Sequence, residues 1–122
     1  DTEAGVFANI TRAREAAIGL WRVGFVPVCP HLNSAFMGGV VGDEVFLAGD
    51  LDILRRCDAV VLLTGWNESA GALAGRDLAV AEGIPLLVWE LVRREGRMRC
   101  VEAKTGMEVR PADVAIRWKG AA

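Results

Sequence analysis

The sequence predicts an α/β domain with a doubly wound, mainly parallel sheet and helices on both faces. Helix-like and strand-like segments alternate along most of the chain, an order that produces parallel strands joined by right-handed crossovers. The strand-like segments Ala59–Thr64 and Ile84–Glu90 are short and almost wholly apolar, as expected for strands buried on both faces. With 122 residues, 52% of them hydrophobic, the chain suits a single domain over residues 1–122 with one core.

The N-terminal third predicts a helix followed by a short strand. Val6–Trp21 carries an apolar stripe at helical spacing, formed by Ile10, Ala13, Ala17, Leu20 and Trp21. Gly24 stands where helices prefer to end. Phe25–Cys29 is predicted as a strand, at an edge or irregular, because Pro27 cannot donate to a ladder. The glycine-rich loop that follows is long enough to cover a site.

The rest of the chain is organised around Gly49–Pro85. Leucines at helical spacing predict a helix over about residues 43–57, and the strand Ala59–Thr64 follows. Ser69 is a helix-capping residue for a second helix over residues 69–82, which Gly83-Ile84-Pro85 ends. The strand Ile84–Glu90 comes next.

The tail predicts a C-terminal β-hairpin. Arg97–Ala103 and Met107–Arg110 flank a turn-forming Lys104-Thr105-Gly106. The surrounding arginines make a solvated edge or, alternatively, an anion or partner contact. Further along, Val114, Ile116 and Trp118 alternate, which predicts a last short strand.

A doubly wound domain normally begins with a buried strand, whereas this chain begins with a helix. The first strand is therefore missing from the predicted order, or the segment Asp113–Trp118 takes its place.

Composition excludes several classes of protein. The formal net charge of −2 argues against a duplex-DNA binder, which would carry a basic surface. No apolar run is long enough to span a membrane, and no signal peptide opens the chain. Three widely separated cysteines, Cys29, Cys57 and Cys100, fit reduced core thiols of a cytoplasmic protein better than a disulfide or metal set.

Two aspartates are candidates for chemistry. Asp50 lies beside the leucine stripe of its helix, where burial would perturb its pKa, although a salt bridge at the boundary explains it equally well. Asp58 heads the apolar strand, and a bond to nearby backbone is its simpler interpretation.

The best candidate ligand site is the loop after the strand Ala59–Thr64, because open α/β sheets bind ligands where strands end and helices begin. Ser69 and Gly71 open a helix whose free N–H groups suit an anion, although they also fit an ordinary cap. Trp66 could stack on a base or cover the sheet edge. His31 and Asn33 follow the predicted strand Phe25–Cys29 and could donate to a ligand hydroxyl or phosphate, or be structural.

Several segments together resemble a known superfamily. They are PHLN at 30–33, GDLDILRRCDAVVLL at 49–63, GW at 65–66, SAGA at 69–72 and GIP at 83–85. In this order and spacing they are similar to the nucleoside 2-deoxyribosyltransferase-like superfamily, and within it to the phage and bacterial DUF4406 group. The resemblance covers about residues 5–90, which leaves residues 91–122 as a C-terminal extension.

The resemblance implies a flavodoxin-like α/β sandwich that forms a homodimer or larger oligomer. Characterised relatives cleave the N-glycosidic bond of deoxynucleosides or deoxynucleoside 5′-monophosphates through a glutamate nucleophile, with no metal or organic cofactor. It implies that Asp50 matches an active-site aspartate, Asp58 the aspartate heading the central strand, and Ser69 a phosphate-holding serine. His31 falls near a loop histidine of some relatives.

The chain departs from this pattern at the nucleophile. The family motif S-x-G-x-x-x-E places the glutamate where this chain has Gly75. Asp77 points about 200° around the helix from that position and is a poor substitute. Glu68 precedes the cap, and the chain has no Tyr for the family's sugar-pocket turn. The sequence therefore predicts a deoxyribosyltransferase-like protein without its usual nucleophile. A non-catalytic nucleotide-binding module and a structural or interaction domain are the alternatives.

Overall fold

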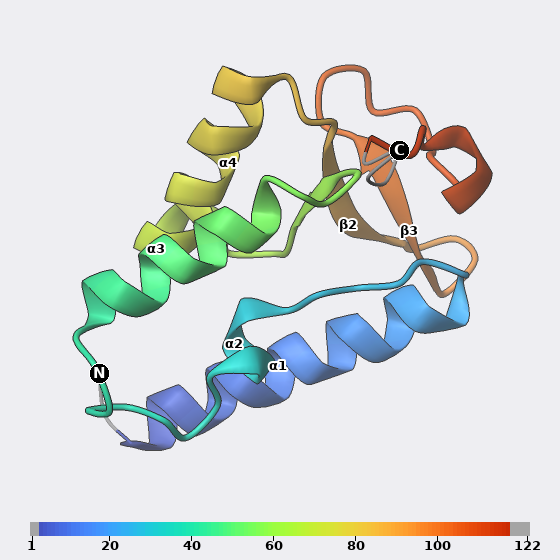
Figure 1. The fold of residues 1–122 in the computed structure, drawn as a ribbon. Coiled ribbons are helices and arrows are strands. Elements are labelled where there is room, and N and C mark those ends of the chain that lie inside the picture. The colour runs from blue at the N-terminus through green and yellow to red at the C-terminus, as the bar shows by residue number, and fades with distance from the viewer. Residues whose placement is uncertain (1–2, 118–122) are drawn as a thin grey trace. The chain divides into compact units, whose positions relative to one another are not determined.

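The computed structural model describes residues 3–117 and divides the chain into two compact units, residues 1–46 and 47–122. It has a mixed α/β architecture with a small, open, three-stranded sheet (Figure 1). The elements in chain order are α1 (Glu3–Arg22), α2 (Pro30–Asn33), α3 (Asp43–Leu54), β1 (Val60–Leu62), η1 (Trp66–Glu68), α4 (Ala70–Glu82), β2 (Leu86–Val92), β3 (Arg97–Glu102) and η2 (Pro111–Asp113).

In the first unit, α1 confirms the predicted N-terminal helix. Gly24 ends it at a φ of 98°, a left-handed conformation that glycine adopts without strain. The amide of Gly24 donates to the carbonyl of Trp21, and the amide of Phe25 to that of Leu20. The local sequence signal therefore located the end of this helix correctly.

The predicted strand Phe25–Cys29 is wrong, since this segment has no regular secondary structure. Pro27 removes a ladder donor, and the chain turns at once into the single-turn helix α2. The carbonyl of Cys29 accepts hydrogen bonds from the amides of Leu32 and Asn33, so this carbonyl is bonded within the helical turn and not in a sheet. A strand needs a partner as well as a suitable sequence, and no described strand pairs with this segment.

In the second unit, β1 and β2 form the predicted parallel pair, with Val60 opposite Leu86 and Leu62 opposite Val88. α4 connects them and packs against both strands. Its N-cap is Ser69, as predicted, and Gly83 ends it at a φ of 67°. Val60, Ala79 and Ile84 form a buried cluster, against which Leu54 and Leu86 pack.

The second strand pairing corrects the prediction of a mainly parallel sheet. β2 pairs with β3 in antiparallel register, with Trp89 opposite Cys100, so the described sheet has one parallel and one antiparallel pairing. Only four residues join the two strands, a connection too short for a parallel crossover. Gly96 turns the chain there at a φ of 62°.

The predicted C-terminal hairpin is confirmed. Val101 forms an antiparallel bridge with Glu108, and the amide of Glu102 donates to the carbonyl of Met107 over 2.8 Å. The predicted last strand is wrong for Val114 and Ile116, which belong to no strand, and Trp118 lies outside the described residues. The segment instead ends in polar contacts made by Arg117 to the start of β1.

The three cysteines are free thiols, but only one belongs to the core. Cys100 on β3 is 2% exposed, and burial raises its pKa to about 11. Cys29 and Cys57 are half-buried, which corrects the expectation that all three are core residues.

Candidate functional site

The loop between β1 and α4 has a backbone that is largely bonded to itself. Gly65 adopts a φ of 85° and admits the short 3-10 helix η1. The amide of Trp66 donates to the carbonyl of Leu63, and that of Ser69 to the carbonyl of Trp66. These bonds fix the path of the chain from the C-terminal end of β1 to the first turn of α4.

Ser69 and Gly71 shape the N-terminus of α4. The Ser69 Oγ accepts a hydrogen bond from the amide of Ala72 over 3.2 Å, as in a standard N-cap. A Cβ added to Gly71 would meet only the Ser69 Oγ, at 3.9 Å, so the backbone here is open to approach. No acidic residue occupies the first turn of α4 to neutralise its partial positive charge.

Trp66 is half-buried, and an arginine lies over its ring. The guanidinium carbon of Arg76 is 5.3 Å from the centroid of the indole, within the range of a cation–π contact. Arg76 also donates from Nε and Nη2 to Oδ1 of Asp77, over 3.1 and 2.8 Å. Sequence reasoning missed Arg76, because ten residues separate it from Trp66 and no motif links them.

Gly75, at the position where the sequence resemblance implies a nucleophile, faces a neighbouring helix. It is buried in α4, and a Cβ built on it would lie 3.2 Å from Cδ1 of Leu54, at the end of α3. A side chain at this position would therefore require Leu54 to shift by a few tenths of an ångström.

Asp58 lies at the N-terminal end of β1, whereas Trp66 and Ser69 follow its C-terminal end. Its Oδ1 accepts the backbone N–H of Arg117 over 2.7 Å. The Arg117 side chain donates to the carbonyls of Cys57, at 2.7 Å, and Arg55, at 3.2 Å. Asp58 thus bonds a backbone N–H that is 59 residues away in the sequence, and not the nearby backbone of its simpler interpretation.

Cys57 lies beside this contact and donates weakly to the carbonyl of Ile53. Burial is the main cause that raises the pKa of its thiol; the Asp58 charge raises it further, while the Arg117 charge opposes the shift. The thiol is therefore held in its protonated, unreactive form at neutral pH.

The structure brings together only some of the predicted site residues. Trp66, Ser69 and Gly71 share the loop and first turn beyond β1, and Asp50 is half-buried on α3 in the same unit. His31 and Asn33 lie on α2 in the other unit.

The first unit has its own open hollow of about 310 Å³. Asn33 and Cys29 line it, together with mainly apolar side chains of α1 and the segment before α2. His31 is exposed and does not line this hollow. An amide among apolar walls can orient a ligand but supplies no acid or base.

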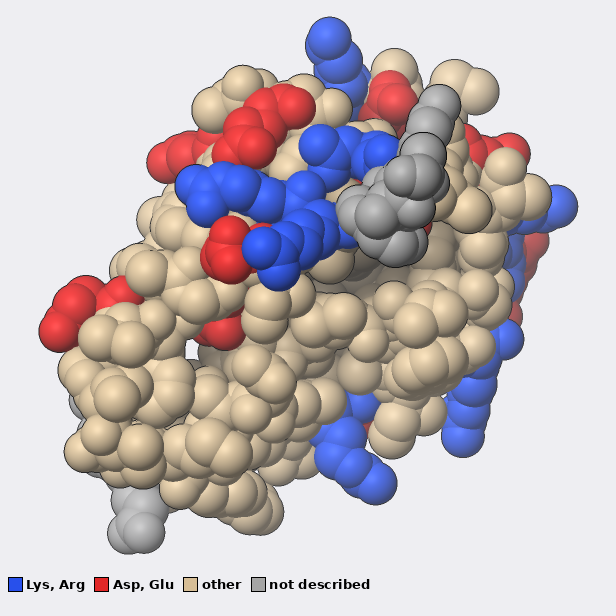
Figure 2. All heavy atoms as spheres, viewed as in Figure 1, with Lys and Arg blue, Asp and Glu red and all other residues tan. Residues whose placement is uncertain are grey.

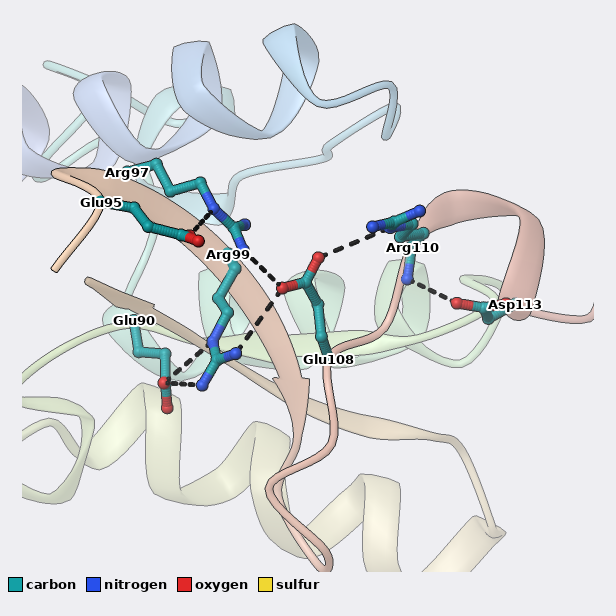
Figure 3. A network of polar contacts seen from close by, with 7 residues as sticks. All are labelled: Glu90, Glu95, Arg97, Arg99, Glu108, Arg110 and Asp113. Carbon is teal, nitrogen blue, oxygen red and sulfur yellow. Dashed lines mark hydrogen bonds and ion pairs between the residues drawn. The ribbon is translucent and has the colours of Figure 1, made fainter. Parts of the chain in front are cut away.

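A polar network covers part of β2, β3 and the return segment, residues 107–110, which pairs with β3 (Figure 3). Glu108 is its centre: it accepts from Arg97 over 3.0 Å and pairs with Arg99 at 3.6 Å and Arg110 at 3.5 Å. Arg99 also bonds Glu90 on the neighbouring strand. The hydrogen bond from Arg97 is the main cause that lowers the pKa of Glu108, and it raises the pKa of Arg97 in turn.

This network explains part of the basic character of the C-terminal tail. Arg97 and Arg99, which the sequence marks as basic, are paired with carboxylates within the chain. Figure 2 shows basic and acidic side chains next to each other on the face drawn there, with no broad field of one sign.

Residues 3–117 hold neither a metal-binding cluster nor a membrane-spanning helix. No three His, Cys, Asp or Glu side chains there gather closely enough to hold a metal ion. None of the described helices has both the length and the apolar character needed to cross a bilayer.

The fold and the loop beyond β1 define a mixed α/β protein with a candidate ligand site at a strand end. Residues 10–88 match the family described as Domain of unknown function (DUF4406). The match spans more than half of the chain, so the protein belongs to this family. No curated protein and no solved structure matches the chain.

Proposed function

We propose that the protein is a nucleoside 2-deoxyribosyltransferase-like protein that binds a deoxynucleoside or a deoxynucleoside 5′-monophosphate without cleaving it. The ligand site is the loop beyond β1, with Trp66 for the base and the α4 N-terminus at Ser69 and Gly71 for a phosphate. The order of the motifs over residues 30–85 supports the superfamily, as does the β1–loop–α4 arrangement.

The proposal that the protein does not cleave its ligand rests on the environment of Gly75. Glycosidic cleavage with a covalent intermediate needs a carboxylate aimed at the anomeric carbon. Gly75 supplies none, and Leu54 Cδ1 stands 3.2 Å from where its Cβ would be. Asp77 is engaged by Arg76 on a different side of α4, and Glu68 lies in η1 before the cap.

The finer features of the fold and assembly belong to the same proposal. We infer a flavodoxin-like, doubly wound domain over residues 1–122, with helices on both faces of its sheet, that forms a homo-oligomer in the cytoplasm. Asp50 then contributes to the site as its counterpart in the superfamily does. No metal or organic cofactor takes part.

The test combines a binding assay with an assay for cleavage. Each deoxynucleoside and each 5′-monophosphate is titrated by calorimetry, and released base is followed by chromatography in parallel. We expect saturable binding with no released base, in the chain as it stands and in Gly75→Gln. Base release by the unchanged chain would show an enzyme whose nucleophile lies elsewhere. Absence of binding would leave a structural or interaction domain.

A second experiment locates the phosphate. Ser69→Ala is expected to weaken binding of a monophosphate about tenfold and that of its nucleoside much less, since only the phosphate meets the α4 N-terminus. Ser34→Ala is the matched control, because the Ser34 hydroxyl bonds a carbonyl of α2 in the other unit. Equal affinities in Ser69→Ala and the unchanged chain would refute the phosphate site.

A further inference from the structure

Trp66 and Arg76 form a cation–π pair beside the loop after β1. The guanidinium carbon lies 5.3 Å from the indole centroid. The side chain of Arg76 is 36% accessible and that of its partner Asp77 is 68% accessible, so the guanidinium is not fully enclosed. The indole is instead anchored by the bonded loop η1.

We propose that Trp66 and Arg76 are the two jaws of a clamp that holds the base of the ligand between an indole and a guanidinium plane. This inference rests on the proposed function and adds a base-positioning residue, Arg76, to it. A base held between the jaws takes the place of the direct contact between the guanidinium and the indole, so the two side chains separate to admit it.

The chemistry of both jaws favours a flat heteroaromatic ring. The indole offers an extended π face, on which every nucleobase can stack. The guanidinium is planar and weakly hydrated, so it stacks on a ring while its edge still donates to Asp77. A lysine ammonium at the same place would keep the charge but lose the plane.

The test compares two ligands that differ only in the base. The probes are deoxyadenosine 5′-monophosphate and deoxyribose 5-phosphate, titrated by calorimetry against the full chain and its variants. We expect Arg76→Lys and Trp66→Leu each to weaken binding of the nucleotide about tenfold and to leave binding of the sugar phosphate unchanged. Arg56→Lys, an exposed arginine on the segment after α3, is the control and should change neither.

The outcomes distinguish a failure of the clamp from a failure of the proposed function. Nucleotide binding that is weakened by Trp66→Leu but not by Arg76→Lys overturns the clamp and leaves the proposed function standing. A loss of thermal stability in Arg76→Lys with an unchanged ratio of the two affinities would assign Arg76 to structure alone, which also overturns the clamp. Failure of the unchanged chain to bind the nucleotide would overturn both.

Discussion

The space beside the backbone of Gly75 limits the side chains that can replace it. The Leu54 side chain lies at the edge of a tight contact with any added Cβ, at 3.2 Å. Leu54 itself packs on the cluster of Val60, Ala79 and Ile84, so it cannot withdraw freely. A longer side chain at position 75 would therefore bring polar atoms into a packed junction between α3 and α4.

We predict that Gly75→Glu lowers the free energy of unfolding by about 2 kcal/mol, through overpacking and partial burial of a carboxylate. Gly75→Ala should change little, because a gain in helix propensity of about 1 kcal/mol offsets a similar crowding cost. Urea denaturation measures both. Gly71→Ala is the control, since its nearest contact would be an ordinary 3.9 Å. Equal stability of Gly75→Glu and Gly75→Ala would contradict this packing.

Ser69 stabilises the first turn of α4 whatever ligand the loop binds. Its Oγ accepts the amide of Ala72, which otherwise lacks a partner within the helix. Ser69→Ala should lower the free energy of unfolding by about 1 kcal/mol, and Ser69→Asp should restore most of it. Thermal melts monitored by circular dichroism test this. A melt of Ser69→Ala indistinguishable from that of the unchanged chain would mean that the cap contributes nothing.

Among the elements, the return segment after β3 depends on charge for part of its attachment. A single bridge, Val101 to Glu108, and a few backbone bonds hold it to β3. Three arginines converge on the carboxylate of Glu108. Since Arg97 and, to a smaller extent, Arg110 lower its pKa below the ordinary 4.5, the ionised carboxylate favours the folded hairpin.

The contribution of Glu108 to stability is therefore complete above about pH 4.5 and is lost as the pH falls through its lowered folded value. We predict that Glu108→Gln unfolds with a weaker acid dependence between pH 5 and pH 3, roughly the range in which carboxyl groups titrate. Amide exchange at Val109, whose N–H donates to Cys100, reports the hairpin directly. Glu15→Gln, on the exposed side of α1, is the control, and an acid dependence equal to its own would refute the role of Glu108.

The elements that the sequence predicted correctly are those with local signals. The helix ends at Gly24 and Gly83 and the cap at Ser69 follow from residues a few positions apart. The prediction of a strand over Phe25–Cys29 was wrong because a strand forms only where it can pair with another strand. The sequence predicted that β3 pairs only with the return segment. It did not predict the antiparallel pairing of β3 with β2, because that register depends on the turn at Gly96.

The candidate site follows the same rule. Trp66, Ser69 and Gly71 could be chosen from a strand end followed by a helix start, and their binding of a ligand stays a prediction. Arg76 and Arg117 could not be chosen, since their contacts join positions that no periodic pattern relates. The bond from Arg117 to Asp58 spans 59 residues of sequence.

For the second unit as a whole, Arg117 ties the C-terminal extension to the junction of α3 and β1. Its guanidinium bonds the carbonyls of Arg55 and Cys57, just beyond the end of α3, where a cation is favoured. Its backbone N–H bonds Asp58. The extension lies beyond the matched residues 10–88, yet these contacts make it part of the same folded unit.

We predict that Arg117→Ala lowers the free energy of unfolding by about 1–2 kcal/mol, because two carbonyls lose a charged donor while the bond from the backbone to Asp58 remains. Asp58→Ala should cost a similar amount, and the double variant less than the sum, since each change loosens what the other holds. Amide exchange at Val60, whose N–H donates to the carbonyl of Pro85, should accelerate in both single variants. Arg94→Ala, an exposed arginine in the β2–β3 turn, is the control. Strict additivity of the two changes, with unaltered exchange at Val60, would mean that the extension rests on β1 without stabilising it.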